Sequence, residues 1–175
     1  LFVEDLVSDF TYTKKNIRLE KLTVETKESF LKGKTILSYD RKDFSNFNNK
    51  VVFDVEIDSS TLATNDIRYF YDELGKNKVF DIKAHVTGPL NNLVLDNLKL
   101  IDDKGSQIVG NVNFKNLFGD DKQRFYMKGN FYRVSSDYDK LSELLPNVLG
   151  KNLPEILRKL GNFFVVGSAE ITATN

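Results

Sequence analysis

The sequence predicts a mainly β fold: a repeating, curled sheet of antiparallel type with short helical insertions. Three observations predict this fold class. Apolar and polar residues alternate along most of the chain, which is typical of strands that bury one face. Aromatic residues make up 12% of the chain, all of them Phe or Tyr, and these residues favour strands. The alternating pattern also returns after 76 residues, which indicates a repeated structural unit.

The clearest element is a hairpin from Asn92 to Phe114. Two runs of alternating apolar residues flank a short polar stretch, Asp102 to Gly105. Gly105 is suited to this stretch because glycine adopts positive φ in a tight turn without steric cost. The segment therefore predicts two paired strands with one apolar and one polar face.

A repeat relates this hairpin to an earlier part of the chain. A shift of 76 places Asn16 and Leu19 on Asn92 and Leu95, and after one inserted residue Gly33 falls on Gly110. We therefore expect a single segment of a repeat array, with units at residues 16–90 and 92–175 and with residues 1–14 as the last strand of a preceding unit. Because the chain begins with Leu1 and not with Met, we expect a fragment or a processed product of a longer protein.

Strands are expected along most of the chain, and each unit is expected to contain three strands, then a helix, then a fourth strand. The apolar alternation places them at residues 6–13, 16–24, 31–37, 51–57, 80–86, 92–100, 108–114, 125–131 and 165–173. The alternation is interrupted in the same way in two places. Successive apolar residues are three positions apart, not two, between Leu19 and Leu22 and again between Leu95 and Leu98. A β-bulge would return the apolar residues to one face and would increase the twist, so we expect a curved sheet.

Short helices are expected after the fourth and the eighth strand. The signals are Ile67, Phe70, Tyr71 and Leu74 at helical spacing before Gly75, then Leu141 to Leu149 before Gly150, and a last short helix between Pro154 and Gly161. Asn65 or Asp66 would cap the first of these helices. Pro146 lies inside the second, where it weakens the prediction.

The composition argues against several classes of protein. Lys plus Arg, 25, equals Asp plus Glu, 25, so no positive excess is present to bind nucleic acid. The chain has no Cys and one His, His85, which argues against a zinc site and against most catalytic arrangements, so we expect no enzyme and no cofactor. His85 lies in the polar register of its strand, which predicts a solvent-facing side chain.

Paired aspartates invite a calcium hypothesis, which we reject. Asp102 with Asp103 and Asp120 with Asp121 lie in predicted turns and lack the spaced ligands of a calcium loop, so we expect no metal site. The sequence contains no run of about 18 apolar residues and no signal peptide, so any membrane anchor is expected outside this chain.

The apolar faces of the strands can be buried in a sandwich, in a closed barrel or in an open trough, and the repeat favours the trough. The alternative is an ordinary core that binds nothing. In the trough, one set of aliphatic and aromatic residues would line a groove for lipid tails. These residues are Leu19, Leu22, Val24, Val55, Ile57, Ile82, Val86, Leu93, Leu95, Leu98, Leu100, Ile108, Val112 and Phe114.

Two stretches of the chain resemble the TamB family of diderm bacteria, in particular its Bacteroidota members. The first is VTGPLNNLVLDNLKLIDDKGSQIVGNVNF with the following KNLFG. The second, similar to the portion of those proteins in which a helix follows a polar strand, is VEIDSSTLATNDIRYFYDELGKNKVFDIKAHVTG. The resemblance covers nearly the whole chain and implies an AsmA-like β-groove, also termed a β-taco. It implies a periplasm-spanning protein with an inner-membrane anchor, phospholipid as cargo and an outer-membrane barrel partner of the TamA or TamL type. The second helical region, Leu141 to Leu160, departs from the pattern because it is long.

Two functions follow as hypotheses. The first is a segment of a bridge whose groove holds acyl chains during transport between the two membranes, linked to outer-membrane assembly. The second is an interaction module that binds unfolded outer-membrane protein by β-strand addition to a free sheet edge. A soluble enzyme is the least favoured hypothesis.

Overall fold

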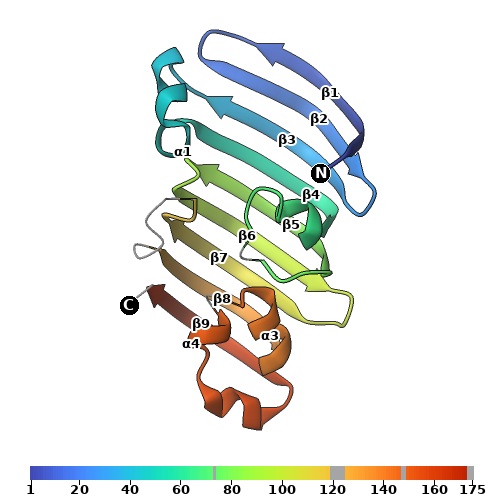
Figure 1. The fold of residues 1–175 in the computed structure, drawn as a ribbon, viewed down its shortest axis with the longest axis vertical. Helices are drawn as coiled ribbons and strands as arrows, with labels where there is room; N and C mark the ends of the chain where they lie inside the picture. Colours follow the sequence, from blue (N-terminus) through green and yellow to red (C-terminus); the bar gives the residue numbers. More distant parts are fainter. Residues whose placement is uncertain (73, 119–124, 147–148, 173–175) are drawn as a thin grey trace.

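The computed structural model describes residues 1–72, 74–118, 125–146 and 149–172, and these form one antiparallel sheet of nine strands with short helices (Figure 1). The strand order follows the chain order. The strands are β1 (Val3–Tyr12), β2 (Asn16–Thr26), β3 (Phe30–Ser38), β4 (Val52–Ala63), β5 (Val79–Gly88), β6 (Asn92–Asp102), β7 (Gln107–Lys115), β8 (Tyr126–Ser136) and β9 (Phe163–Thr172). Every strand that the alternation predicts is confirmed, except that the predicted end of β9 at Ala173 lies outside the described residues.

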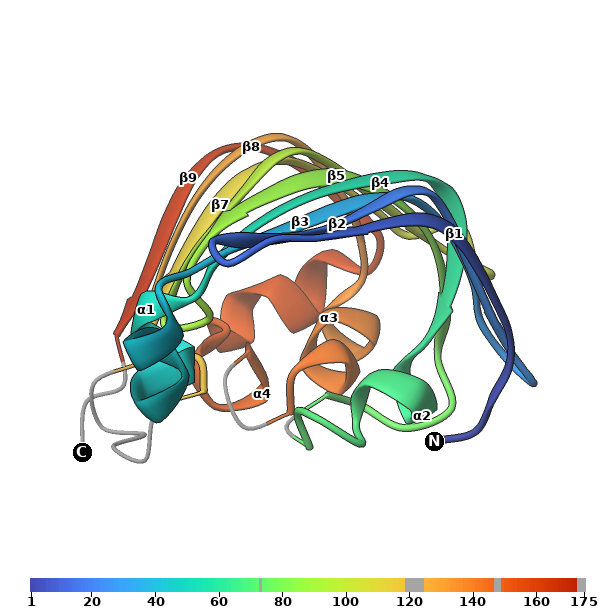
Figure 2. The same ribbon diagram turned by 90° about the horizontal axis from the view of Figure 1, so that it is seen from above.

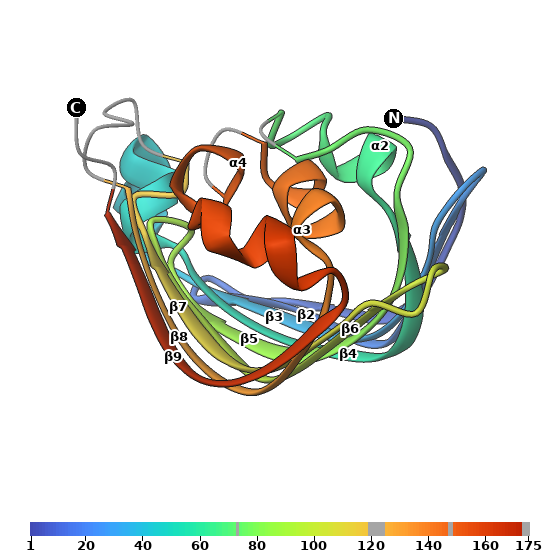
Figure 3. The ribbon, with the colours of Figure 1, turned by 90° about the horizontal axis from the view of Figure 1, so that it is seen from below.

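The sheet is open, with β1 and β9 as its two edges. Seen along its long axis it arches over one side, and the helices lie on this inner side (Figures 2 and 3). It is neither closed nor strongly curled, so the sandwich and the barrel are excluded for the described residues, and the expected curling is confirmed only as an arch. Each strand pairs only with its neighbours in the chain, so the sheet extends in one direction and its ends stay apart.

Both predicted bulges are present. The register of β2 with β3 shifts between Leu19 and Leu22, and that of β6 with β7 shifts between Leu95 and Leu98. Within the shifts, Lys21 has φ 51° and Asn97 has φ 52°. Each bulge therefore contains one residue in the left-handed region, and the leucine that follows it returns to the face of the leucine that precedes it.

The strand pairings repeat along the sheet. In the register of β1 with β2, Asp9 lies opposite Glu20. In the register of β5 with β6, His85 lies opposite Asp96, which is the same pair of positions shifted by 76 residues. The β4·β5 and β8·β9 pairings also share a mid-strand register shift, between Ile57 and Ser60 in the first and between Phe131 and Val134 in the second. Hence β1, β5 and β9 occupy equivalent places in a period of four strands. The unit boundaries at 16–90 and 92–175 stay a prediction.

The helices differ most from the prediction. The helix expected over Ile67 to Leu74 ends at Ile67, as α2 (Thr64–Ile67). Beyond it the Arg68 guanidinium donates to the carbonyl oxygens of Asp72 and Leu74, and the Tyr69 and Phe70 side chains are exposed. An apolar pattern this short does not stabilise a helix without a packed face, because helix nucleation is unfavourable.

The second helical region is divided where Pro146 was expected to weaken it. It forms α3 (Tyr138–Leu144) and α4 (Leu149–Asn152), since proline lacks an N–H group and clashes with the preceding turn. The Asp137 carboxylate caps α3 by accepting from the Lys140 N–H at 2.8 Å. The last predicted helix is present as the 3₁₀ helix η3 (Glu155–Leu160) between Pro154 and Gly161.

The sequence reasoning missed the helical segment between β3 and β4, which contains η1 (Arg41–Asn46) and α1 (Phe47–Lys50). Aromatic rings contact one another from Tyr39 to Phe44 to Phe47 and on to Phe53 in β4, in tilted or edge-on pairs with centroid distances of 4.7, 6.3 and 5.9 Å. This aromatic series holds the segment against one end of the sheet. Its helical signal is short, because only Phe44, Phe47 and the buried Val51 follow a helical spacing.

Candidate functional site

The predicted groove residues all lie on one face of the sheet. Residues directly opposite each other in neighbouring antiparallel strands share a face. One row of such pairs crosses the sheet from edge to edge, through Phe10, Leu19, Thr35, Val55, Val86, Leu95, Val112, Gly129 and Ala169. The remaining predicted residues lie in the rows on either side of it. The row contains no charged residue.

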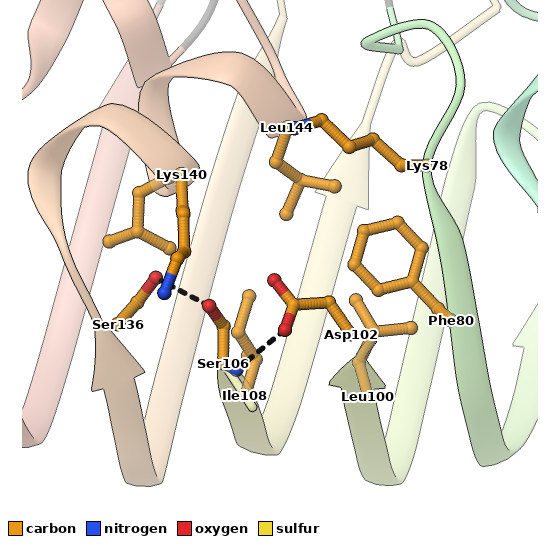
Figure 4. Close-up of a pocket in the computed structure, with 10 residues that line it drawn as sticks. Lys78, Phe80, Leu100, Asp102, Ser106, Ile108, Ser136, Lys140 and Leu144 are labelled. Atoms are coloured by element: carbon orange, nitrogen blue, oxygen red, sulfur yellow. Dashed lines mark hydrogen bonds between the residues drawn. The ribbon is translucent and has the colours of Figure 1, made fainter. Parts of the chain in front are cut away.

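This face is the inner face, on whose side the helices lie. Phe80 of β5, Leu100 of β6 and Ile108 of β7 meet Leu141 and Leu144 of α3 around a small pocket (Figure 4). The segment after α2 holds α3 in place, because the Gly75 N–H donates to the Leu144 carbonyl at 2.9 Å. The Lys78 ammonium also pairs with the Glu143 carboxylate.

The buried core cluster lies under only one part of the inner face. A buried cluster of Ala84, Leu98, Val112, Phe125 and Met127 forms the core of the part between β5 and β9. Six predicted residues are partly buried and pack against this cluster, and Leu93 is buried beside them; the six are Ile82, Val86, Leu95, Leu100, Ile108 and Phe114. The predicted residues of β2 and β4 lie outside the cluster and are half-buried: Leu19, Leu22, Val24, Val55 and Ile57.

The helices explain this division. In Figure 1 α3 and α4 lie in front of the strands at the β9 end of the sheet, whereas no helix lies in front of the middle of β1, β2 and β3. Leu22 and Leu98 occupy equivalent places after the two bulges, yet Leu98 is 8% exposed and Leu22 is only half-buried. We name the β1 to β4 part of the inner face the open part and the β5 to β9 part the covered part.

Sequence reasoning left out three members of the core, namely Ala84, Phe125 and Met127. Ala84 and Met127 are in the apolar register of β5 and β8, so the alternation was the signal that could have included them. Phe125 precedes β8 directly, and its ring lies 6.4 Å from that of Phe114. These residues extend the predicted face toward β9.

The pocket beneath α3 is small and its polar groups are paired (Figure 4). Its cavity of about 20 Å³ corresponds to one water molecule. The Ser106 N–H donates to Asp102 Oδ1 at 2.6 Å, and the Ser136 hydroxyl lies 3.0 Å from that of Ser106. Lys140 pairs with Asp137 at 3.2 Å. The pocket therefore leaves no room for a bound molecule beyond water.

Two carboxyl groups beside this pocket have perturbed titration. The backbone N–H of Lys140, with the Lys140 ammonium, lowers the pKa of Asp137 below its ordinary value. The hydrogen bond and the charge of Lys78 lower the pKa of Glu143. Both groups are thus held in the charged form where α3 meets the sheet.

The outer face carries the charged residues. The prediction that His85 is a solvent-facing strand residue is confirmed, and its Nε2 lies 2.8 Å from Asp54 Oδ1. Lys83 lies 3.8 Å from Asp58, and Lys34 lies 3.6 Å from Glu20. The sheet therefore has one charged face and one apolar face, as the alternation predicts.

The turn interpretation of Asp102 is confirmed, because its carboxylate accepts from the backbone N–H groups of Lys104 and Ser106. Asp120 and Asp121 lie outside the described residues. Within residues 1–72, 74–118, 125–146 and 149–172, no group of three or more His, Cys, Asp or Glu side chains could hold a metal ion. In the same ranges no helix has the length and apolar character to cross a membrane.

Comparison of the chain with protein-family models, with curated proteins and with solved structures finds no match.

Proposed function

We propose that the inner face binds the acyl chains of phospholipid and that the chain is one segment of a lipid-conducting groove of the TamB kind. The observation that carries the proposal is the unbroken row from Phe10 to Ala169, which crosses every strand of the sheet without a charge. Here the open part stays half-buried around Leu19 and Leu22.

The energetics of burial suit a ligand that binds weakly and can move along the face. Each methylene group of an acyl chain that leaves water contributes about 0.8 kcal/mol, so partial shielding of one tail suffices for binding. The hydrophobic effect has no direction, so a tail can move along an aliphatic face without breaking specific bonds. Transport along such a face is passive guidance, and the chain performs no catalysis.

The proposal includes the longer protein of which this chain would be a segment. In a longer array, the arched sheet would continue beyond β1 and β9 and curl into a deeper trough, the β-groove of AsmA-like proteins. Such a protein would lie in the periplasm, with an inner-membrane anchor outside this chain. It would meet an outer-membrane barrel of the TamA or TamL type through other regions.

A second candidate function is supported by the edges of the sheet. The apolar side chains of Leu6 and Phe10 in β1 are 56% and 63% exposed, and Phe164 and Val166 in β9 are exposed as well. An exposed strand edge recruits another strand. This observation favours an interaction module that binds unfolded outer-membrane protein by strand addition.

Native mass spectrometry of the purified chain tests the lipid proposal. We expect co-purified phospholipid on the wild type and its loss in Leu22→Asp, which charges the open part. Thr23→Asp is the matched control, because the next residue of the same strand points to the outer face and its variant should keep the lipid. A soluble wild-type monomer without lipid, or equal lipid loading in both variants, would contradict the proposal.

A further inference from the structure

We propose that an uncharged pocket at one end of the sheet binds a hydroxyl-rich ligand, namely a pyranose ring of a saccharide. The pocket lies where the segment with η1 and α1 meets the β5–β6 turn, residues 89–91, and Phe118 beyond β7. In Figure 1 α1 lies at the end of the sheet where β4 begins. These connections belong to strands inside the sheet, so the pocket depends on neither edge strand. The inference goes beyond lipid binding and does not depend on it.

The pocket has room for a small ligand and its lining carries no charge. Its volume is about 400 Å³, within the range of about 300 to 1,000 Å³ that is typical of small-molecule sites. Residues 44–49, Asn91 and Phe118 line it, and these are four asparagines, three phenylalanines and one serine. An ionic ligand would find no opposite charge in this lining. The ligand that fits is therefore neutral and polar.

Asn91 connects the parts of the chain that form the pocket. Its backbone N–H donates to the Asn48 carbonyl at 2.9 Å, and its Oδ1 accepts from the Phe118 N–H at 3.1 Å. The Asn48 side chain in turn donates to the Phe118 carbonyl at 3.4 Å. These hydrogen bonds join three segments that are far apart in the sequence. The lining is thus held in place before a ligand binds, which reduces the entropic cost of binding.

The side-chain amides of the pocket form a series that ends at Asn46. Asn91 Nδ2 donates to Asn49 Oδ1 at 3.1 Å, and Asn49 Nδ2 donates to Asn46 Oδ1 at 2.6 Å. Within the described residues, Asn46 Nδ2 donates to no acceptor. Asn46 directly precedes α1, yet its side chain makes no capping hydrogen bond. Its two N–H groups are therefore available to a ligand.

A pyranose ring matches this lining in two ways. Its hydroxyl groups both donate and accept, so neighbouring hydroxyls can pair with the N–H and the C=O of one amide. Its C–H face is apolar and can pack on the face of an aromatic ring. Phe44 offers such a ring, because it contacts Tyr39 at a centroid distance of 4.7 Å and still remains 49% exposed. The amides and the ring together favour a sugar over other neutral ligands.

Solution NMR of the intact chain tests the proposal, with the methyl pyranosides of glucose, galactose, mannose and N-acetylglucosamine as probes. We expect at least one of them to bind saturably and to shift the side-chain amide signals of Asn46, Asn48 and Asn49. Asn46→Asp keeps the acceptor that Asn49 uses and removes both N–H donors, so it should weaken this binding roughly tenfold. Phe44→Leu keeps an apolar side chain without the flat ring and should weaken the binding roughly threefold.

Two matched variants control for general effects of these substitutions. Asn130→Asp changes an amide on the outer face whose Oδ1 likewise accepts, from the Ser168 hydroxyl at 3.3 Å. Phe70→Leu changes an exposed ring outside the pocket. Both controls should bind the sugar as tightly as the wild type does.

The source of the sugar follows from a comparison of methyl and octyl glycosides. Equal affinity would identify a free saccharide as the ligand, whereas tighter binding of the octyl form that Asn46→Asp abolishes would identify the headgroup of a glycolipid. Three results would overturn the proposal: no saturable shift at the pocket with any probe, undiminished affinity in Asn46→Asp, or inorganic phosphate that binds the same residues as tightly as the sugar.

Discussion

Gly33 and Gly110 occupy the same place in the two parts of the sheet, each directly opposite the leucine that follows a bulge. A Cβ atom on Gly33 would lie 1.8 Å from the Glu56 carbonyl oxygen, and one on Gly110 would lie 2.3 Å from that of Asn130. The backbones of neighbouring strands therefore approach closely at the middle of the arch. Only glycine permits this approach.

Gly33→Ala is expected to destabilise the chain by about 1 to 3 kcal/mol, because the added methyl group must displace a backbone carbonyl and not a flexible side chain. The measurement is urea denaturation followed by circular dichroism. Thr35→Ala, two residues along the same strand and face, serves as the control and should cost less than about 1 kcal/mol. A Gly33→Ala variant as stable as this control would show that the strands do not approach at this point.

The bulges predict that Gly is more stabilising than Val at position Lys21, which reverses the usual order of these two residues in a strand. Lys21 has positive φ, and the left-handed region costs an ordinary L-residue about 1 to 2 kcal/mol, more than the entropy that glycine loses on folding. We expect Lys21→Gly to preserve or raise the free energy of unfolding and Lys21→Val to lower it, although Val is the better strand former in general. The same substitutions at Asn97 provide an internal repeat of the test. If Val is the more stable of the two variants at both positions, the bulges are absent in solution.

Local patterns predicted the strands and the bulges because each depends on residues close in sequence. The spacing of Leu19 and Leu22 determines which face each side chain joins, whatever lies elsewhere in the chain. The division of the inner face could not be predicted in this way. It depends on Leu141 and Leu144 of α3 meeting Phe80 and Leu100, which lie on strands far earlier in the chain.

The helices were harder to predict for a related reason. Helical spacing from Ile67 to Leu74 describes an amphipathic segment, but no surface covers Phe70, so the helix ends early. The segment from Arg41 to Lys50 offers only Phe44 and Phe47 at helical spacing, and the contacts among the rings of Tyr39, Phe44 and Phe47 hold it in place. In both segments tertiary contacts, and not the local pattern, determine whether a helix forms.

The covered and open parts should differ in their sensitivity to truncation. Leu98 is buried in the core cluster, so Leu98→Ala is expected to cost about 3 kcal/mol. Leu22 holds the equivalent place in the open part, where water already reaches the side chain, and Leu22→Ala should cost about 1 kcal/mol. Denaturation of both variants under identical conditions makes the comparison. Equal losses would mean that the two parts of the inner face are covered alike.

Acid should weaken the attachment of α3 to the sheet. The folded-state pKa values of Asp137 and Glu143 are lowered, so both groups bind protons more weakly in the folded chain than in the unfolded chain. Their stabilising contribution is therefore complete at neutral pH and is lost as the pH falls below about 4, the ordinary range of these carboxyl groups. Asp137→Asn keeps a good N-cap without the charge and should flatten the dependence of stability on pH between 5 and 3. Asp137→Ala removes the cap and should cost about 1 kcal/mol already at pH 7. A wild-type chain whose unfolding free energy decreases just as steeply with acid as that of Asp137→Asn would exclude Asp137 as a source of the dependence.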